Sequence, residues 1–203
     1  LNEHIQRVGV KAVYEEAAYT RFNRLIAIRI MQKNHFIEPV LSYDNPEIRV
    51  PHIVSEARRG SIMCALTDDE QNRLRNLLMD DTKTQEQFAL LIIAYCRENA
   101  VISNCFGGIA PYLELLLPDD ILSQNRFIDL LNNTNEYITE EQFRSAELIG
   151  WLYQFYISEK KDEVFASFKN GRKAEAEDIP AATQIFTPNW IVKYMVQNTV
   201  GRS

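Results

Sequence analysis

The chain is poor in residues that interrupt helices, with seven glycines and seven prolines among 203 residues. Long stretches contain neither, which favours helices over a β fold with many turns. Hydrophobic residues make up 46% and charged residues 25% of the chain, ordinary globular values that argue against wholesale disorder. We therefore expect a mainly all-α fold: a multi-helix, bundle-like domain with one short extended segment and a C-terminal helical arm.

Long apolar runs are absent as well. The best run, Phe88 to Tyr95, is far short of the roughly 20 residues that cross a bilayer, so no membrane partner is expected. The first residues, Leu1 to His4, do not begin a signal peptide, because no basic region is followed by an apolar stretch. The initial leucine in place of methionine suggests an excised piece of a longer protein.

Cysteine and histidine are scarce. The spacings of Cys64, Cys96 and Cys105 fit no zinc pattern and the three histidines are scattered, so no metal site is predicted. Cys96 lies in an apolar helical stretch, which predicts a buried, reduced thiol and a cytoplasmic location.

Charge of one sign is concentrated at the start of the chain. Residues 1–33 contain six basic and three acidic residues, a net charge of +3, whereas the whole chain carries −6, so the remainder carries −9. A basic helix face could contact a phosphate backbone, could be a solvated face, or could pair with the acidic remainder. The candidate phosphate contacts are Arg21, Arg24, Arg29, Arg58 and Arg59.

Apolar periodicity and capping patterns locate the helices. Apolar residues at near-helical spacing predict a first helix over about 8–34, and prolines then enforce extended chain over 36–53, with a short edge strand at 48–50. Thr67, Thr82 and Thr139 each begin a capping-box pattern, and these predict helices from 67 to about 79, 82 to about 98, and 139 to at least 161. Asp119 and Asp120 suit the first turn of a helix that reaches about residue 131.

The C-terminal part reads as a linker and an arm. We expect a helical domain over residues 1–168, a linker over 169–186 and a helix over 187–203, with Thr187 as N-cap and Pro188 in the first helical position. Trp151 and Phe155 share a helix face, which predicts that both are buried, with Tyr153 and Tyr156 at the margin of that face.

Three stretches are distinctive: AYTRFNRLIAIR at 18–29, ELIGWLYQFYISEKKDEVF at 147–165 and IPAATQIFTPNWIVKYMV at 179–196. Together they resemble the region ahead of the catalytic domain in PglX-type DNA methyltransferases of BREX phage-defence systems and in related large restriction-modification methylases. The resemblance implies transfer of a methyl group from S-adenosylmethionine to the exocyclic amine of adenine in double-stranded DNA, with the target base rotated out of the stack.

The same resemblance assigns a cofactor contact to Phe186, Thr187 and Pro188 in the intact enzyme. A helix N-terminus with free amides suits the carboxylate of the cofactor. The alternative is that Thr187 and Pro188 simply begin a helix.

Two catalytic features are absent from the chain. No glycine-rich turn follows a β run, because Gly107-Gly108 lacks a preceding strand and lies before Thr187. No Asp/Asn-Pro-Pro-aromatic motif is present. Both are expected beyond Ser203, so this chain alone is predicted to bind no cofactor and to transfer no methyl group.

A nuclease activity is less well supported by the sequence. Pro118-Asp119 with Glu159-Lys160-Lys161 matches a nuclease pattern in letters, but both lie in helical sequence, whereas that site needs adjacent strands to hold magnesium. The accessory roles left open are a DNA clamp, a support for the catalytic domain, a module that docks other defence-system proteins, and a structural brace.

Overall fold

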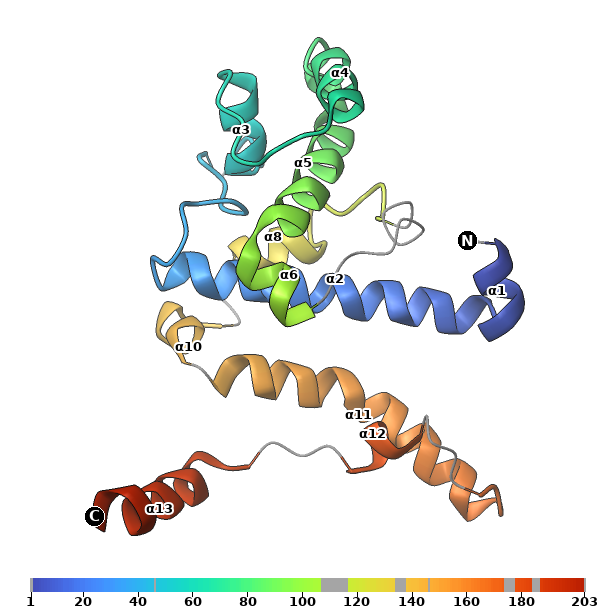
Figure 1. The fold of residues 1–203 in the computed structure, drawn as a ribbon. Helices are drawn as coiled ribbons and strands as arrows, with labels where there is room; N and C mark the ends of the chain where they lie inside the picture. Colours follow the sequence, from blue (N-terminus) through green and yellow to red (C-terminus); the bar gives the residue numbers. More distant parts are fainter. Residues whose placement is uncertain are drawn as a thin grey trace. The chain divides into compact units, whose positions relative to one another are not determined.

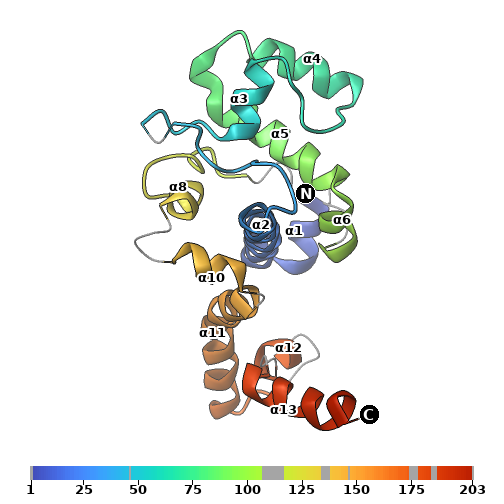
Figure 2. The same ribbon diagram turned by 90° about the vertical axis from the view of Figure 1, so that its left-hand side faces the viewer.

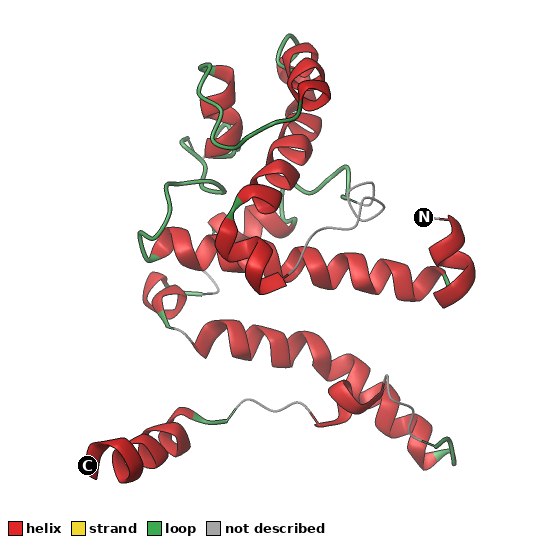
Figure 3. Cartoon of the chain, in the orientation of Figure 1, coloured by secondary structure: helices red, strands yellow, loops and turns green. Residues whose placement is uncertain are grey.

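The computed structural model describes residues 2–45, 47–106, 117–133, 138–145, 147–173, 178–183 and 187–202. Within these ranges the chain forms eleven α-helices, two short 3-10 helices and no β-strand, which confirms the mainly all-α fold class (Figure 3). The chain divides into two compact units, residues 1–144 and 145–203. None of the described helices combines the length and the apolar character that a membrane span requires.

Unit 1 is organised around one long helix, α2. Its elements are α1 (Asn2–Val8), α2 (Val10–Lys33), α3 (His52–Arg58), α4 (Asp68–Leu77), η1 (Asp81–Lys83), α5 (Thr84–Glu98), α6 (Ala100–Phe106), α8 (Phe127–Asn132) and α10 (Glu140–Arg144). Helices α1, α6 and α10 pack against α2, while α3, α4 and α6 pack against α5 (Figures 1 and 2). Gly9, with φ 87°, separates α1 from α2.

The core of unit 1 draws apolar side chains from nearly every element. The α2 side chain of Phe22 also meets Phe127 of α8, with ring centroids 5.8 Å apart. The apolar residues with 0% exposure are Ile28, Val40, Leu41, Ile53, Val54, Phe88, Leu91, Ala94, Ile102, Ile128 and Phe143. Cys96, 5% exposed, is buried as predicted, and burial raises the pKa of its thiol to about 12.

Unit 2 contains α11 (Glu147–Lys169), α12 (Asp178–Thr183), α13 (Asn189–Thr199) and η2 (Val200–Arg202). Helix α12 packs against α11, and Arg172 pairs with the buried carboxylate of Asp178 at the start of α12. The expected boundaries of a domain at residue 168 and of a linker at residue 186 stay a prediction.

Two of the three capping boxes form as predicted. The Thr67 hydroxyl accepts the Glu70 amide and the Glu70 carboxylate accepts the Thr67 amide, which starts α4. Thr139 and Gln142 make the same reciprocal pair at the start of α10. The single long helix expected after Thr139 is interrupted, however, because α10 ends at Arg144. The Ser145 hydroxyl then accepts the Glu147 amide at 3.2 Å, at the start of α11.

The capping box predicted at Thr82 does not form. Asp80 accepts the Thr82 amide and hydroxyl and caps η1, so that α5 begins at Thr84. Aspartate captures the first amide because its short carboxylate, two residues earlier, forms a local turn with that N–H.

The strand expected at 48–50 is also wrong. The side chain of Asn45 accepts the Glu47 amide at 2.9 Å in an Asx turn, and Arg49 takes a left-handed φ of 52°. Its guanidinium lies 3.7 Å from the buried carboxylate of Asp129. An isolated bridge between Tyr43 and Pro51 is the remaining extended pairing in this described segment.

The helix expected from Asp119 begins eight residues later. Residues 119–126 form turns, and Asn125 has a left-handed φ of 60° that interrupts a helix. Its amide donates to Asp129 Oδ2 at 2.8 Å, so a residue of α8 itself fixes the turn.

Trp151 is 55% exposed, so its predicted burial is wrong. The side chains of Tyr153, Phe155 and Tyr156 lie outside the described set.

The ion pair between Glu70 and Arg97 makes stability depend on pH. Arg97 donates from two nitrogens to the two carboxylate oxygens at 2.7 Å, and these bonds lower the pKa of Glu70 to about 2. Because this folded-state pKa lies below the unfolded value near 4.3, the stabilisation is present above about pH 4.5 and is lost as pH falls towards 2.

We therefore expect the advantage of the wild type over Arg97→Gln, measured by urea denaturation, to shrink as pH falls from about 5 to about 3. The variant Arg75→Gln is the control, because Arg75 lies on the same helix α4 as Glu70 and, among the described residues, donates to the neutral side chain of Asn72. A difference between the wild type and Arg97→Gln that stays constant with pH contradicts the prediction.

Candidate functional site

Two of the five candidate arginines are buried in unit 1. Arg24 is 4% exposed and donates from Nη1 to the Thr20 carbonyl and from Nη2 to the Phe106 carbonyl, both at 3.1 Å. Its guanidinium lies 5.9 Å from the centre of the Phe106 ring, and burial lowers the pKa of Arg24. Arg24 thus ties the end of α6 to α2, and its guanidinium does not reach the surface.

Arg29, one turn and a half further along α2, is 3% exposed. Its Nη1 donates to Ser42 Oγ at 2.8 Å, and the guanidinium lies 6.0 Å from the centre of the Phe143 ring. Arg29 therefore connects α2 to the segment after it and to α10. Neither buried arginine presents a charge to a phosphate backbone in this structure.

Arg58 is engaged between helices. Its Nε donates to Gln87 Oε1 at 3.0 Å, and its Nη2 donates to the Asp81 carbonyl and to Thr84 Oγ1. Gln87, 0% exposed, donates in turn to the carbonyls of Leu77 and Asp80. This network holds α3 on α5 and fixes the turn between α4 and α5.

Arg59 and Arg21 are the more accessible candidates. The Arg59 side chain is 62% exposed, and it pairs with Glu56 at 2.6 Å and with Asp44 at 3.5 Å. The Glu56 hydrogen bond raises the pKa of Arg59. Arg21 is half-buried, and burial lowers its pKa to about 10. These two stay candidate phosphate contacts.

The candidate cofactor segment lies before α13. Phe186 is outside the described residues, while Thr187 and Pro188 are exposed. Helix α13 begins at Asn189, and Pro188, not Thr187, occupies the N-cap with φ −55° and ψ 141°. The predicted cap is therefore one residue out of register, and the N-cap residue Pro188 offers no side-chain hydrogen bond to the first amides of α13. Such amides can donate hydrogen bonds to a carboxylate.

Helix α13 carries a feature that helical periodicity did not reveal. None of its residues is buried, and large apolar side chains are exposed along it. They are Trp190 (71%), Val192 (44%), Tyr194 (64%), Met195 (58%) and Val196 (52%), with Val200 (73%) following in η2.

No group of His, Cys, Asp and Glu side chains within the described ranges is arranged to hold a metal ion. The cysteines Cys64 and Cys96 are buried and Cys105 is exposed, and all three are free. Burial raises the pKa of the Cys64 thiol to about 11, which disfavours the reactive thiolate.

Comparison with known proteins gives two relatives. The adenine-specific methyltransferase BrxX of Escherichia coli O9:H4 (strain HS) is 37% identical over 198 residues, which are 96% of this chain and 16% of BrxX. The adenine-specific methyltransferase PglX of Lacticaseibacillus casei (strain Zhang) is 36% identical over 196 residues, which are 93% of this chain and 16% of PglX. No protein-family model matches the chain.

The chain therefore spans about one sixth of the length of these relatives. The alignments cover 93–96% of the chain at 36–37% identity, which confirms the resemblance seen in the distinctive stretches. Nearly the whole chain is thus similar in sequence to two adenine-specific methyltransferases, BrxX and PglX.

Proposed function

We propose that this chain is a non-catalytic accessory part, near the N-terminus, of an S-adenosylmethionine-dependent, adenine-specific DNA methyltransferase of a BREX phage-defence system. The observation that carries the proposal is similarity to two adenine-specific methyltransferases over 93–96% of the chain. The helical character of the described residues supports an accessory role, because methyl transfer needs the glycine-rich turn and the Asp/Asn-Pro-Pro-aromatic motif that the chain lacks.

In this proposal α13 supports the catalytic domain by packing against it. An isolated helix of eleven residues is marginal in water, and its exposed apolar side chains gain about 25 cal/mol for each Å² of apolar surface they bury. Since the relatives are about six times as long as the chain, the remainder of the same protein is the partner with the highest effective concentration.

The uncapped amides of α13 fit the carboxylate of S-adenosylmethionine, with Phe186, Thr187 and Pro188 alongside it in the intact enzyme. The cofactor supplies the methyl group. The residues of this chain would hold its carboxylate at the N-terminus of α13. Double-stranded DNA is the proposed substrate of the whole enzyme, with Arg21 and Arg59 as the accessible candidates for backbone contact.

Methyl transfer tests the proposal. The 203-residue chain should transfer no tritium from labelled S-adenosylmethionine to duplex DNA, whereas the longer protein should transfer it. In the longer protein, Trp190→Ser should lower the rate roughly tenfold or more, because burying one large aromatic side chain contributes about 2 kcal/mol to docking. Met79→Ser, which removes an 80% exposed apolar side chain from unit 1, is the matched control.

Transfer by the short chain alone would exclude a purely accessory role. Unchanged transfer in the Trp190→Ser enzyme would exclude docking of α13 on the catalytic domain.

The alternative function is a module that docks other defence-system proteins, and the exposed residues of α13 favour it as well. It predicts that Trp190→Ser leaves methyl transfer intact and abolishes a protein complex. Such an apolar interface should tolerate salt, whereas binding through backbone phosphates should weaken steeply as salt rises.

A further inference from the structure

A pocket of about 500 Å³ lies at the C-terminal end of α2, within unit 1. It is lined by Gln32, Lys33, His35, Phe36, Ile37, Glu38, Pro39 and Arg144. None of these residues was a candidate in the sequence, because they come from the end of one helix, the loop after it and the end of α10.

The loop turns by a Schellman motif with an unusual residue in its left-handed position. The Phe36 amide donates to the Met31 carbonyl at 2.9 Å and the His35 amide to the Gln32 carbonyl at 3.1 Å. This pattern places His35 at the position that glycine usually occupies, and its φ is 59°. A side chain there is strained, and strain of this kind concentrates at functional sites.

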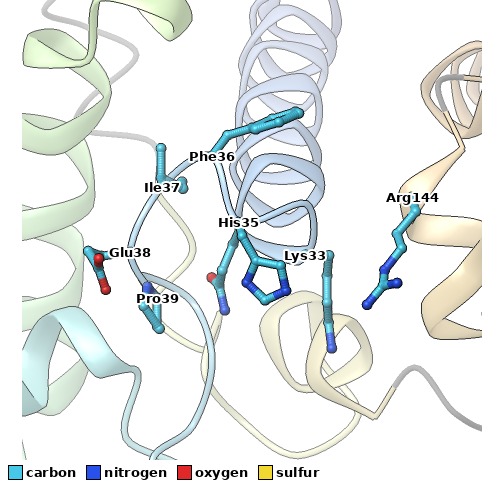
Figure 4. A pocket seen from close by; sticks show the side chains of 8 residues that line it. Lys33, His35, Phe36, Ile37, Glu38, Pro39 and Arg144 are labelled. Carbon is cyan, nitrogen blue, oxygen red and sulfur yellow. The ribbon is translucent and has the colours of Figure 1, made fainter.

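Basic groups from two elements meet in the pocket. Figure 4 shows Lys33, His35 and Arg144 on one side of it and Glu38 on the other. Asn34 holds the two elements together, since its Nδ2 donates to the Ile30 carbonyl of α2 and to the Phe143 carbonyl of α10. Arg144 makes no ion pair with any residue that the structure describes.

The carbonyls that end α2 do not oppose an anion strongly. Those of Ile30, Met31 and Gln32 are each hydrogen-bonded by the amides and the side chain that follow them. Lys33 also places a positive charge in the last turn. The side chains that line the pocket therefore set the local charge, with Lys33, Arg144 and His35 set against the carboxylate of Glu38.

An exposed aromatic ring adjoins these groups. Phe36 lines the pocket and is 75% exposed, so most of its ring is accessible to a ligand. Basic groups beside an exposed aromatic ring are the combination that binds a nucleotide, with the phosphate on the cations and the base on the ring.

We propose that this pocket binds a nucleotide phosphate through Lys33, His35 and Arg144, with the base stacked on Phe36. The volume is within the range of small-molecule sites. The nucleotide could belong to an unpaired DNA strand or be free in solution, and the same groups would recognise either. The inference stands on the pocket and does not require the methyltransferase proposal.

The test uses the 203-residue chain and a short, dye-labelled single-stranded oligodeoxynucleotide of mixed sequence, titrated at several salt concentrations. Arg144→Gln and Lys33→Gln should each weaken binding roughly tenfold and reduce the dependence of log K on log salt by about 0.7. Arg73→Gln, which removes an exposed arginine from α4, is the control for charge and should leave the affinity unchanged.

Two further variants separate binding from folding. His35→Gly should weaken binding while raising the midpoint of thermal unfolding by about 2 °C, because glycine relieves the left-handed strain. Phe36→Ser should weaken binding about fivefold or more through loss of stacking. Tyr14→Ser, which removes a 60% exposed aromatic side chain from α2, is its control.

Competition with adenosine 5′-monophosphate, duplex DNA and inorganic phosphate identifies whether the bound nucleotide is free or part of a strand. Displacement by the mononucleotide supports a free nucleotide, and displacement only by unlabelled single strand supports an unpaired strand. Displacement by inorganic phosphate at the same concentration as by the mononucleotide overturns the role of Phe36. Absence of binding, preferred binding to duplex, or equal losses in Arg73→Gln and Arg144→Gln overturn the proposal, and none of these outcomes depends on methyl transfer.

Discussion

Replacing Gln32 with methionine is expected to lower the free energy of unfolding by about 3 kcal/mol, because two buried amides would lose their acceptor. Gln32 Oε1 accepts the Val40 amide at 3.1 Å and the Leu41 amide at 3.2 Å, and both of these residues are 0% exposed. Methionine fills the same volume without an acceptor, so the change in packing is small.

The loss should propagate because the segment held by Gln32 anchors α3. The Ile53 amide donates to the Val40 carbonyl and the His52 amide to the Ser42 carbonyl. Ser42 Oγ also accepts from Gln32 Nε2 and from Arg29 Nη1. One side chain on α2 thus organises the start of α3 and the loop that forms the pocket.

Gln32→Glu is the matched control, since its carboxylate can still accept both amides, and the guanidinium of Arg29 binds the same Ser42 hydroxyl as Gln32. It should lose clearly less stability than Gln32→Met when both are unfolded in urea and followed by circular dichroism. Equal losses in the two variants would show that the packing of Gln32, and not its hydrogen bonds, stabilises the fold.

Charge reversal at Arg24 or Arg29 is expected to destabilise the chain by about 3–5 kcal/mol, because each substitution places an uncompensated carboxylate in the core. Both arginines are at most 4% exposed, and both donate to oxygen atoms that would face the new glutamate. Arg59→Glu, at an exposed side chain, should change stability by less than about 1 kcal/mol.

The same urea titrations measure these differences, with Arg59→Glu as the control for charge. A loss below about 1 kcal/mol in Arg24→Glu would contradict the assignment of Arg24 as a buried link between α2 and α6. The result also decides how DNA-binding data are interpreted. A loss of binding in Arg24 or Arg29 variants reports on folding, whereas Arg21 and Arg59 variants can report on the interface itself.

The sequence predicted those elements whose signals are local. The reciprocal pairs of Thr67 with Glu70 and of Thr139 with Gln142 need only four residues of chain, and both formed. The apolar spacing along α2 placed its end within one residue. Such signals suffice because capping and helical periodicity are satisfied within the helix itself.

The errors arose where side chains outside the recognised patterns determine the backbone. Arg49 and Asn125 take left-handed conformations without being glycine, and in both cases the carboxylate of Asp129 is the partner. His35 also takes a left-handed conformation, at the end of α2. A pattern of residue types did not reveal these contacts: the partner of Arg49 lies 80 residues away in the chain, and that of Asn125, four residues on, belongs to no capping pattern.

The candidate site shows the same division. Five arginines were chosen by charge, yet burial separates Arg24 and Arg29 from the others. The pocket was missed because Arg144 lies more than a hundred residues from Lys33 in the chain. Its one sequence signal was Phe36, an aromatic residue in a polar loop between a helix and prolines.

Both tryptophans of the chain, Trp151 and Trp190, lie in unit 2 and are 55% and 71% exposed. Intrinsic emission excited at the indole band therefore reports on unit 2 and is insensitive to local unfolding of unit 1. In the longer protein, a shift of this emission to shorter wavelength, absent from the Trp190→Ser variant, would mark the transfer of the Trp190 indole from water to an apolar environment. Trp190 fluorescence can therefore report whether α13 is docked against an apolar surface.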